Sequence, residues 1–344
     1  MSIVTALPVA ELTDRIEEIF RKAGLSIAQS AAIARVIAAG EQDACKSHGI
    51  YRIEGCLRTL KAGKVVPCAE PVAVADGSAI VRVDARQGFA PLAFEIGLPH
   101  LVERTRALGL AALVINDCTH FSALWPEVEA LTERGLAGLA LCPSYSAVAP
   151  AGGQRPLFGT NPMAFGWPRP SGAPYVFDFA TSMVARGEIE LHRRAGQPIP
   201  EGWAIDTEGA PATDPERALA GALLPFGGHK GSAISTMIEL LGGPMIGDFT
   251  SAEALGVLGS TSLLPRHGEL ILAFDVEQFA RGRPGDPLAR AEVLFDAILG
   301  QGARLPSQRR FAARARTEVE GIPLTAAELE QLDRFARLGL DALP

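Results

Sequence analysis

The sequence predicts an α/β protein in which a helical domain, built from both chain ends, accompanies a central domain of strands and helices. Three observations lead to this fold class: the first 70 residues carry apolar side chains at helical spacing, short apolar runs suited to strands begin near residue 72, and the chain end is again helical. The 344 residues are enough for two domains. We therefore expect residues 1–70 with 286–344 to form the helical domain and residues 71–285 the α/β domain.

Helices are predicted at both ends of the chain. Residues 10–23 place apolar side chains three and four positions apart, as one face of a helix requires. Ser26 can cap a second helix that extends through residue 39, because a serine oxygen accepts a bond from an otherwise free backbone N–H. A third helix begins near Tyr51, and residues 291–298 and 326–338 show the same spacing.

Strands and helices alternate in the central region. Apolar runs at residues 79–83, 110–115 and 136–141 are typical of buried strands. Amphipathic segments at residues 89–107 and 124–133 lie between them and predict helices. This alternation favours strand-helix-strand units.

A stretch rich in proline and glycine, residues 143–174, follows these units and predicts a connecting or site-forming region. Residues 163–166 form a short strand within it, and residues 176–177 are a second short apolar run. A helix over residues 232–241 follows a cluster of glycines. The chain contains no internal repeat or low-complexity segment.

The composition is that of an ordinary globular protein, with 48% hydrophobic and 21% charged residues. The formal net charge of -7 argues against nucleic acid or an anionic membrane surface as the main partner, because both attract basic proteins. An anionic ligand therefore needs positive charge concentrated at its site. No apolar run approaches the length of about 20 residues that a membrane helix needs.

The cysteines and the chain start bear on compartment and metal binding. Five cysteines form no CxxC pair and no zinc spacing, so we expect reduced thiols in the cytoplasm and no metal site. The first residues lack a basic segment followed by a long apolar one, and we expect no signal peptide.

Ser47, His48 and Gly49 stand at the expected end of the second helix, with Arg52 shortly after. Glycine commonly follows a helix and histidine in a last turn favours the helix dipole, so the motif could be a helix end and nothing more. If a new helix starts near Gly49, the four-residue spacing places His48 and Arg52 on one face. There Arg52 can hold a carboxylate at two points while His48 exchanges a proton.

His120 and Phe121 follow the strand predicted at residues 110–115 and precede the helix that starts near Leu124. In open α/β sheets ligands bind beyond the carboxyl ends of strands, and a following helix offers free N–H groups to a phosphate. A loop histidine with one hydrogen bond is the alternative.

Two segments further along combine small and polar residues. Residues 159–162, Gly-Thr-Asn-Pro, could be a turn before a strand. Residues 178–188 put Asp178 and Glu188 at the ends of a segment of small side chains, which permits close approach of a cofactor. A capping role for Asp178 is the alternative.

Two basic segments complete the candidates. Residues 227–231, Gly-Gly-His-Lys-Gly, precede a helix, where backbone amides and Lys230 can hold an anionic group, although the full phosphate-loop spacing is absent. No Gly-x-Gly-x-x-Gly occurs in the chain. Residues 304–310 are rich in arginine, and a solvated basic turn is the alternative there.

Taken in order, Ser-His-Gly-x-x-Arg, Gly-Thr-Asn-Pro and Gly-Gly-His-Lys-Gly resemble the malate/L-lactate dehydrogenase type 2 family of NAD(P)-dependent oxidoreductases. The resemblance covers essentially the whole chain and implies a mixed-sheet cofactor domain that is not a Rossmann fold, usually in a homodimer. It also implies a catalytic His48 whose tautomer and charge are set by Ser47 and Glu188. Many relatives have Asp where this chain has Glu188, so the geometry of that relay is open.

The resemblance further implies a substrate site and a cofactor site. Arg52 and Thr160 would bind the substrate. The residues that would bind the cofactor are His120, Phe121, Ser122, Ala123, Leu124, Asp178, Phe179, Ala180, His229, Lys230, Arg304, Leu305, Pro306, Ser307, Gln308, Arg309 and Arg310.

Within that family, the segments around Gly-Thr-Asn-Pro and Gly-Gly-His-Lys-Gly look most like the reductases of Δ1-piperideine-2-carboxylate and Δ1-pyrroline-2-carboxylate. This similarity implies an NADPH-dependent reduction of a cyclic imino acid, in proline metabolism, with NADH as a second possible cofactor. A 2-hydroxy-acid dehydrogenase for malate, lactate or ureidoglycolate is the alternative, since it needs the same Arg52 and His48. A catalytically silent protein that binds NADPH is a third hypothesis.

Overall fold

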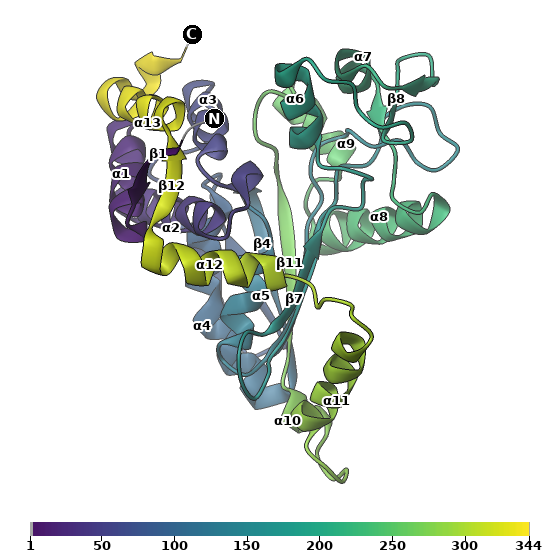
Figure 1. Cartoon of the computed structure of the whole chain (residues 1–344). Coiled ribbons are helices and arrows are strands. Elements are labelled where there is room, and N and C mark those ends of the chain that lie inside the picture. The colour runs from purple at the N-terminus through teal and green to yellow at the C-terminus, as the bar shows by residue number, and fades with distance from the viewer. Residues whose placement is uncertain (1–2, 344) are drawn as a thin grey trace.

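A mixed seven-stranded sheet runs through the middle of the molecule (Figure 1). The computed structural model describes residues 3–343, so Met1, Ser2 and Pro344 of the expected helical domain lie outside it. β3 and β4 are parallel, and every other neighbouring pair is antiparallel. The strands in spatial order are β2 (Val72–Val74), β3 (Ile80–Asp84), β4 (Leu110–Thr119), β11 (Arg266–Phe274), β5 (Ala137–Leu141), β6 (Met163–Trp167) and β7 (Tyr175–Phe179).

Helices cover both faces of this sheet. α4 (Ala90–Leu108) and α5 (Trp125–Thr132) pack on one face, where Leu113 of β4 is fully buried. α8 (His229–Gly242) packs on the other, against Val114 of the same strand. Neighbouring side chains of a strand point to opposite faces, so β4 contributes to two cores. A strand buried on both faces is nearly continuous in apolar residues, which explains why the sequence predicted it.

The helices predicted at residues 10–23, 26–39, 326–338 and from Tyr51 are confirmed and share one core. The helix predicted at residues 291–298 also forms, but it lies outside this core and packs against β7, so the expectation that it belongs to the helical domain is wrong. The oxygen of Ser26 accepts a hydrogen bond from the backbone N–H of Gln29, as an N-cap should. A two-stranded antiparallel sheet joins the chain ends and was not predicted, since each strand finds its partner only at the other end of the chain. These elements are α1 (Val9–Lys22), α2 (Ile27–Gln42), α3 (Tyr51–Lys61), α13 (Ala326–Leu338), η3 (Gly339–Ala342), β1 (Ile3–Leu7) and β12 (Ile322–Thr325).

The expectation of strand-helix-strand units is only half right. β3, α4 and β4 form such a unit with parallel strands, but β11 lies between β4 and β5. The sequence missed β11 because Arg266, His267 and Glu269 interrupt the apolar pattern of its first half. Burial of these polar residues depends on neighbours from other parts of the chain.

The remaining elements surround the end of the sheet and the bottom of the molecule as drawn (Figure 1). α10 (Val276–Phe279) and α11 (Pro287–Gly300) contact each other, and the ring of Phe295 in α11 stacks on Tyr175 of β7. A small three-stranded sheet forms a separate core with α6 and α7. The other elements are η1 (Lys46–His48), α6 (Arg186–Ala195), β8 (Ala204–Ile205), β9 (Pro211–Ala212), α7 (Pro215–Ala220), β10 (Ala222–Leu223), η2 (Pro244–Ile246), α9 (Ser251–Leu258) and α12 (Gln308–Glu320).

All five cysteine thiols are free. Among residues 3–343, no helix combines the length and the apolar character that a membrane crossing demands.

A buried network of two acids and two arginines connects the helical core to the sheet. Asp43 follows α2, Glu129 lies on α5, and Arg310 and Arg314 lie on α12. Asp43 Oδ2 lies 2.6 Å from both Arg310 Nη1 and Arg314 Nη2, and Glu129 Oε2 lies 2.8 Å from Arg314 Nη2. Glu129 also pairs with Arg310. Each arginine therefore contacts both acids, and three elements far apart in sequence are held together.

We expect Asp43→Asn to lower the free energy of unfolding by about 3–5 kcal/mol, because it leaves the buried guanidinium of Arg310 and the half-buried one of Arg314 with one acid. Denaturant unfolding would measure the change. Glu11→Gln is the matched control, since Glu11 pairs with Arg15 in an exposed site and such pairs contribute about 0–1 kcal/mol. Equal effects of the two substitutions would contradict the structural role of the network.

Candidate active site

A cleft of about 1430 Å³ lies where the helical core, the end of the central sheet and α6 meet. Most of the predicted site residues line it, although they come from five separate parts of the chain. Leu124, His229 and Lys230 do not line it. Those that do are Ser47, His48, Arg52, His120, Phe121, Ser122, Ala123, Thr160, Asp178, Phe179, Ala180, Glu188, Arg304, Leu305, Pro306, Ser307, Gln308, Arg309 and Arg310.

The turn that carries His48 is held against α2 by Glu41. The buried Glu41 carboxylate accepts a hydrogen bond of 2.9 Å from the Ile50 N–H and pairs with Lys46 at 2.5 Å. A Cβ on Gly49 would stand only 2.0 Å from Glu41 Oε1, so no larger residue fits there. The glycine therefore serves close packing, and η1 followed by α3 presents His48 and Arg52 to the same cleft.

His48 is oriented by two neighbours. Ser47 Oγ lies 3.1 Å from His48 Nδ1, and the Trp125 ring packs edge-on at 5.8 Å between centroids. A hydroxyl at Nδ1 leaves Nε2 available to a ligand. Burial, and then the charge of Arg52, lower the pKa of His48 to about 3, so the imidazole is neutral in the ligand-free protein at pH 7.

Arg52 is a guanidinium without an acidic partner. Its Nε–H is buried and donates to no acceptor within residues 3–343, and no carboxylate of that range forms an ion pair with it. The one aromatic ring of the described residues that lies against its guanidinium is that of Tyr51, with 5.9 Å from the guanidinium carbon to the ring centroid. Burial lowers the pKa of Arg52. A buried cation without a counter-ion is costly, and a ligand carboxylate would remove that cost.

Thr160 lies in a turn that hydrogen bonds hold in one conformation. Its carbonyl accepts hydrogen bonds from the backbone N–H and the hydroxyl of Thr181. The next residue, Asn161, is fully buried and donates from Nδ2 to Glu239 at 2.8 Å, while its Oδ1 accepts from Ser251. Because only the carbonyl of Thr160 is engaged in these bonds, its hydroxyl and its N–H are the groups left for a ligand.

Asp178 caps α5. Its Oδ2 accepts hydrogen bonds from the backbone N–H groups of Leu124, at 2.7 Å, and Trp125, at 2.9 Å. Burial raises the pKa of Asp178 to about 6 despite these bonds. The expectation that this helix start offers free N–H groups to a phosphate is therefore wrong, because a carboxylate of the chain already occupies them. The capping alternative is confirmed, and Asp178 still lines the cleft.

The arginines of residues 304–310 have different environments. Arg310 is buried and paired with Asp43 and Glu129, so the alternative of a solvated basic turn is wrong for this residue. Arg304 and Arg309 line the cleft, are exposed, and form no ion pair with any described residue. They are the arginines of this segment that can contact an anionic ligand.

His229 and Lys230 begin α8 and are exposed outside the cleft. Gly227 and Gly228 before them have φ of 56° and 60°, a left-handed conformation that side chains disfavour. The glycines therefore form the sharp entry to the helix. Within one chain, the structure does not bring these two basic residues to His48.

Glu188 lies in the first turn of α6 and lines the cleft as an exposed side chain. No hydrogen bond or ion pair joins it to His48 within the described part of the chain. Ser47 makes the contact with the imidazole instead.

Three residues that support the site were given no role by the sequence. Glu41 fixes the His48 turn, Trp125 packs on the imidazole, and Asn161 locks the Thr160 turn. An acid in the last turn of an otherwise apolar helix was the one available signal for Glu41. Nothing local marks the other two, because their partners lie on distant elements.

The cleft suits an elongated anionic ligand. Ser122 Oγ is buried in its wall without a hydrogen-bond partner among the described residues, and Ala123 and Ala180 leave space beside it. Unpaired guanidinium groups of Arg52, Arg304 and Arg309 line the same cleft. Positive charge is therefore concentrated in a chain of net charge -7, as an anionic ligand requires. These features fit a nicotinamide dinucleotide.

The match to known proteins extends over nearly the whole chain. The family model described as malate/L-lactate dehydrogenase matches residues 7–333. The chain belongs to this family. Family membership implies a nicotinamide cofactor, and the predicted resemblance is confirmed.

Similar proteins of the malate/L-lactate dehydrogenase family carry reductase names. A Δ1-pyrroline-2-carboxylate reductase from Agrobacterium fabrum is 70% identical over 344 residues, which is 100% of both chains. A Δ1-pyrroline-2-carboxylate/Δ1-piperideine-2-carboxylate reductase from Pseudomonas aeruginosa is 55% identical over 92% of this chain and 95% of its own. The crystal structure of Δ1-piperideine-2-carboxylate reductase from Pseudomonas syringae has a TM-score of 0.92 and 40% identity, covering 96% of this chain and 100% of that one.

We expect Arg52→Gln to raise the pKa of His48 above its value of about 3, because one of the two causes of the low value is removed. A carboxylate bound to Arg52 in the unmodified protein should act in the same direction. An NMR titration of the histidine signals measures both effects, with His48 assigned from the signal lost in His48→Ala.

Arg58→Gln is the matched control for this titration. Arg58 lies on the same helix and in the same cleft, but it is paired with Glu54 at 2.6 Å. The pKa of His48 should be unchanged in this variant. An unchanged pKa in Arg52→Gln as well would show that the two side chains do not interact.

Proposed function

We propose that this chain is an NADPH-dependent reductase of cyclic imino acids, which converts Δ1-pyrroline-2-carboxylate or Δ1-piperideine-2-carboxylate to L-proline or L-pipecolate. The names of its relatives support the substrate class. The observation in this molecule that carries the proposal is the guanidinium of Arg52 beside His48, which is partly buried and has no acidic partner among residues 3–343. It is a preformed carboxylate site next to a group that exchanges protons.

Arg52 and Thr160 hold the substrate in this proposal. The guanidinium binds the carboxylate at two points, which orients the adjacent C=N bond in the cleft. The Thr160 hydroxyl supplies a further hydrogen bond from a turn that Asn161 keeps rigid. Positioning of this kind accounts for a large part of the rate enhancement in hydride-transfer enzymes.

His48 delivers the proton. Reduction adds a hydride to C2 and a proton to the ring nitrogen, and the nicotinamide cofactor supplies the hydride. The carboxylate cancels the charge of Arg52, one of the two causes that lower the pKa of His48, so substrate binding favours the protonated imidazole. Ser47 holds Nδ1 and keeps Nε2 toward the substrate. Glu188 does not contact His48. In this proposal it helps to position the ligand from its place in the cleft wall.

The cofactor would occupy the cleft along residues 120–123 and 178–180, in a binding mode that is not that of a Rossmann fold, while Leu124, which was also predicted to bind it, lies outside the cleft. Ser122 offers its free hydroxyl, and the side chains of Ala123 and Ala180 are small enough for close approach. Arg304 and Arg309 bind its phosphate groups, because Arg310 is already neutralised and His229 and Lys230 lie outside the cleft.

Larger-scale features belong to the same proposal. The helical domain, predicted as residues 1–70 with 286–344 but without α11, which packs on β7, and the α/β domain of residues 71–285 each supply one wall of the site. The molecule works as a homodimer. The free thiols suit the cytoplasm.

A substrate panel tests the function. With NADPH, we expect turnover of Δ1-pyrroline-2-carboxylate and Δ1-piperideine-2-carboxylate. The fall in the absorbance of NADPH measures this turnover. The kcat/KM for pyruvate and oxaloacetate should be lower by at least about 100-fold, since the names of the relatives point to an imine substrate rather than a ketone. A reversed order would identify a 2-hydroxy-acid dehydrogenase. Cofactor binding without turnover of any compound would leave only the silent binding protein.

We expect His48→Ala to lower kcat for the imine by about 10²- to 10⁴-fold, the usual contribution of a general acid. Cofactor affinity should be unchanged, which fluorescence titration with NADPH would check. His100→Ala is the control, since His100 lies on α4 and outside the cleft. If His48→Ala kept more than about a tenth of the activity of the unmodified protein, His48 would not be the general acid and would serve only at the end of a helix.

We expect NADPH to be preferred over NADH by about ten- to a hundredfold in affinity, because charge-assisted hydrogen bonds to the additional phosphate contribute about 1.5–3 kcal/mol. KM values for both cofactors at saturating imine measure the preference. Replacing both Arg304 and Arg309 by Gln should abolish it, while Arg316→Gln, on the same helix as Arg309 and outside the cleft, should not. A lower KM for NADH in the unmodified protein would contradict the assignment.

A further inference from the structure

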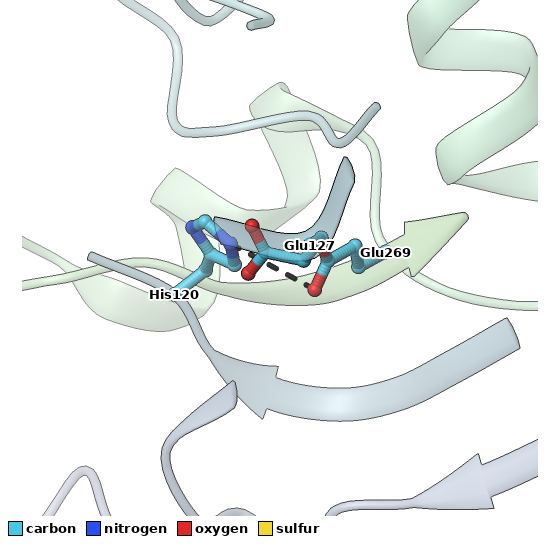
Figure 2. A group of neighbouring side chains, drawn as sticks. All are labelled: His120, Glu127 and Glu269. Carbon is cyan, nitrogen blue, oxygen red and sulfur yellow. Dashed lines mark ion pairs between the residues drawn. The ribbon is translucent and has the colours of Figure 1, made fainter. Parts of the chain in front are cut away.

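A buried cluster of three ionisable side chains lies behind the wall of the cleft (Figure 2). His120 directly follows β4, Glu127 lies on α5, and Glu269 lies on β11. Their exposed fractions are 5%, 3% and 0%. Figure 2 shows the three side chains directed toward one another. His120 also lines the cleft, whereas Glu127 and Glu269 do not.

The polar atoms of this cluster have no hydrogen-bond partners among residues 3–343. These atoms are His120 Nε2, Glu127 Oε2 and both carboxylate oxygens of Glu269. One ligand atom from each residue lies within 4.8 Å of the other two. The atoms are thus too far apart to bond directly and too enclosed to be hydrated individually. Buried polar groups in proteins normally have hydrogen-bond partners or ligands. The unpaired atoms of these three side chains therefore indicate a bound group between them.

The charges of the surrounding side chains limit which group can be bound between His120, Glu127 and Glu269. No Lys or Arg of the described chain pairs with Glu127 or Glu269, and the one ionic contact is His120 Nε2 to Glu269 Oε2 at 3.8 Å. Both oxygens of Glu269 and one of Glu127 are buried without a hydrogen-bond donor among the described residues. The two carboxyl groups therefore need either a cation or protons.

We propose that His120, Glu127 and Glu269 bind one divalent transition-metal ion, of the Zn²⁺ or Mn²⁺ class. One neutral imidazole nitrogen and two carboxylates are ligands that these ions favour, and a dication balances both negative charges. With metal–ligand bonds of about 2.1 Å in tetrahedral geometry, ligand atoms stand about 3.4 Å apart. The distance of 3.8 Å between His120 Nε2 and Glu269 Oε2 is close to this value, and all three ligand atoms lie within 4.8 Å of one another, so an inward movement of the side chains completes the site.

Protons alone fit the geometry less well. Two carboxyl groups that share a proton bring their oxygens within hydrogen-bond distance of about 2.5–2.7 Å. Here Glu127 Oε2 and both Glu269 oxygens have no such contact in the described structure. A central ion satisfies all three side chains at once.

The ion would connect the end of β4, α5 and β11, which are far apart in the sequence. β4 and β11 are neighbours in the sheet, and α5 packs on one face of it. It would hold His120, and with it the segment that continues to Ser122 and Ala123 in the cleft wall. This role is structural and does not depend on the proposed reaction, because no step of that reaction involves Glu127 or Glu269.

Metal uptake by the full-length chain without an affinity tag tests the proposal. The protein is treated with a chelator, dialysed, and titrated separately with ZnCl₂ and MnCl₂, with metal content measured after gel filtration. We expect about one ion per chain in at least one series. Glu269→Gln and Glu127→Gln, which preserve shape, should weaken binding by at least about 100-fold. The control is Glu133→Gln, an exposed residue at the end of the same helix as Glu127, which should bind as the unmodified protein does.

Thermal unfolding provides a second measurement for variants that fold poorly. The ion should raise the Tm of the unmodified protein and of Glu133→Gln but not that of Glu269→Gln, because only a bound ion stabilises the native state. Uptake below about 0.1 ion per chain in both series would overturn the proposal. Equal affinity in Glu269→Gln would also overturn it. A higher Tm for Glu269→Gln together with no metal uptake would show that protons neutralise the cluster.

Discussion

The network of Asp43, Glu129, Arg310 and Arg314 is the interaction on which the position of the cleft depends. It joins the end of α2, the middle of α5 and the start of α12, so it fixes the helical core against the sheet. The turn with His48 begins just after Asp43, and the Trp125 ring, which contacts both His48 and Arg310, belongs to α5. A change in this network would therefore displace the imidazole relative to the sheet.

The pairing of arginines with acids in this network shows how a chain of negative net charge can form a positively charged site. Arginines that serve the fold are paired with acids, as Arg310 is, whereas Arg52, Arg304 and Arg309 lack such partners among the described residues. Unpaired guanidinium groups in an enclosed space attract carboxylate and phosphate groups strongly. Burial, and then the charge of Arg52, keep His48 neutral in the ligand-free protein. In the proposed function, carboxylate binding removes the second of these causes and so favours proton uptake.

The wall between the cleft and the buried cluster consists of one short segment. His120 contacts Glu269 on its inner side, and Ser122 and Ala123 face the cleft a few residues later. Asp178 anchors the following residues by accepting the N–H groups at the start of α5. Whatever neutralises Glu127 and Glu269 must therefore affect the shape of the cleft. The buried cluster and the cleft are coupled through the backbone of about five residues between them.

The sequence by itself determined the helices at both chain ends, the strands with continuous apolar runs, and the residue types of the candidate site. These features depend on local spacing, as in the cap at Ser26 and the four-residue step from His48 to Arg52. Only the tertiary structure decided that β11 lies between β4 and β5, that Arg310 is neutralised, and that Asp178 occupies the start of α5. It also brought Glu127 and Glu269 to His120. The charge and availability of a side chain depend on neighbours distant in the sequence, and local pattern carries no information about them.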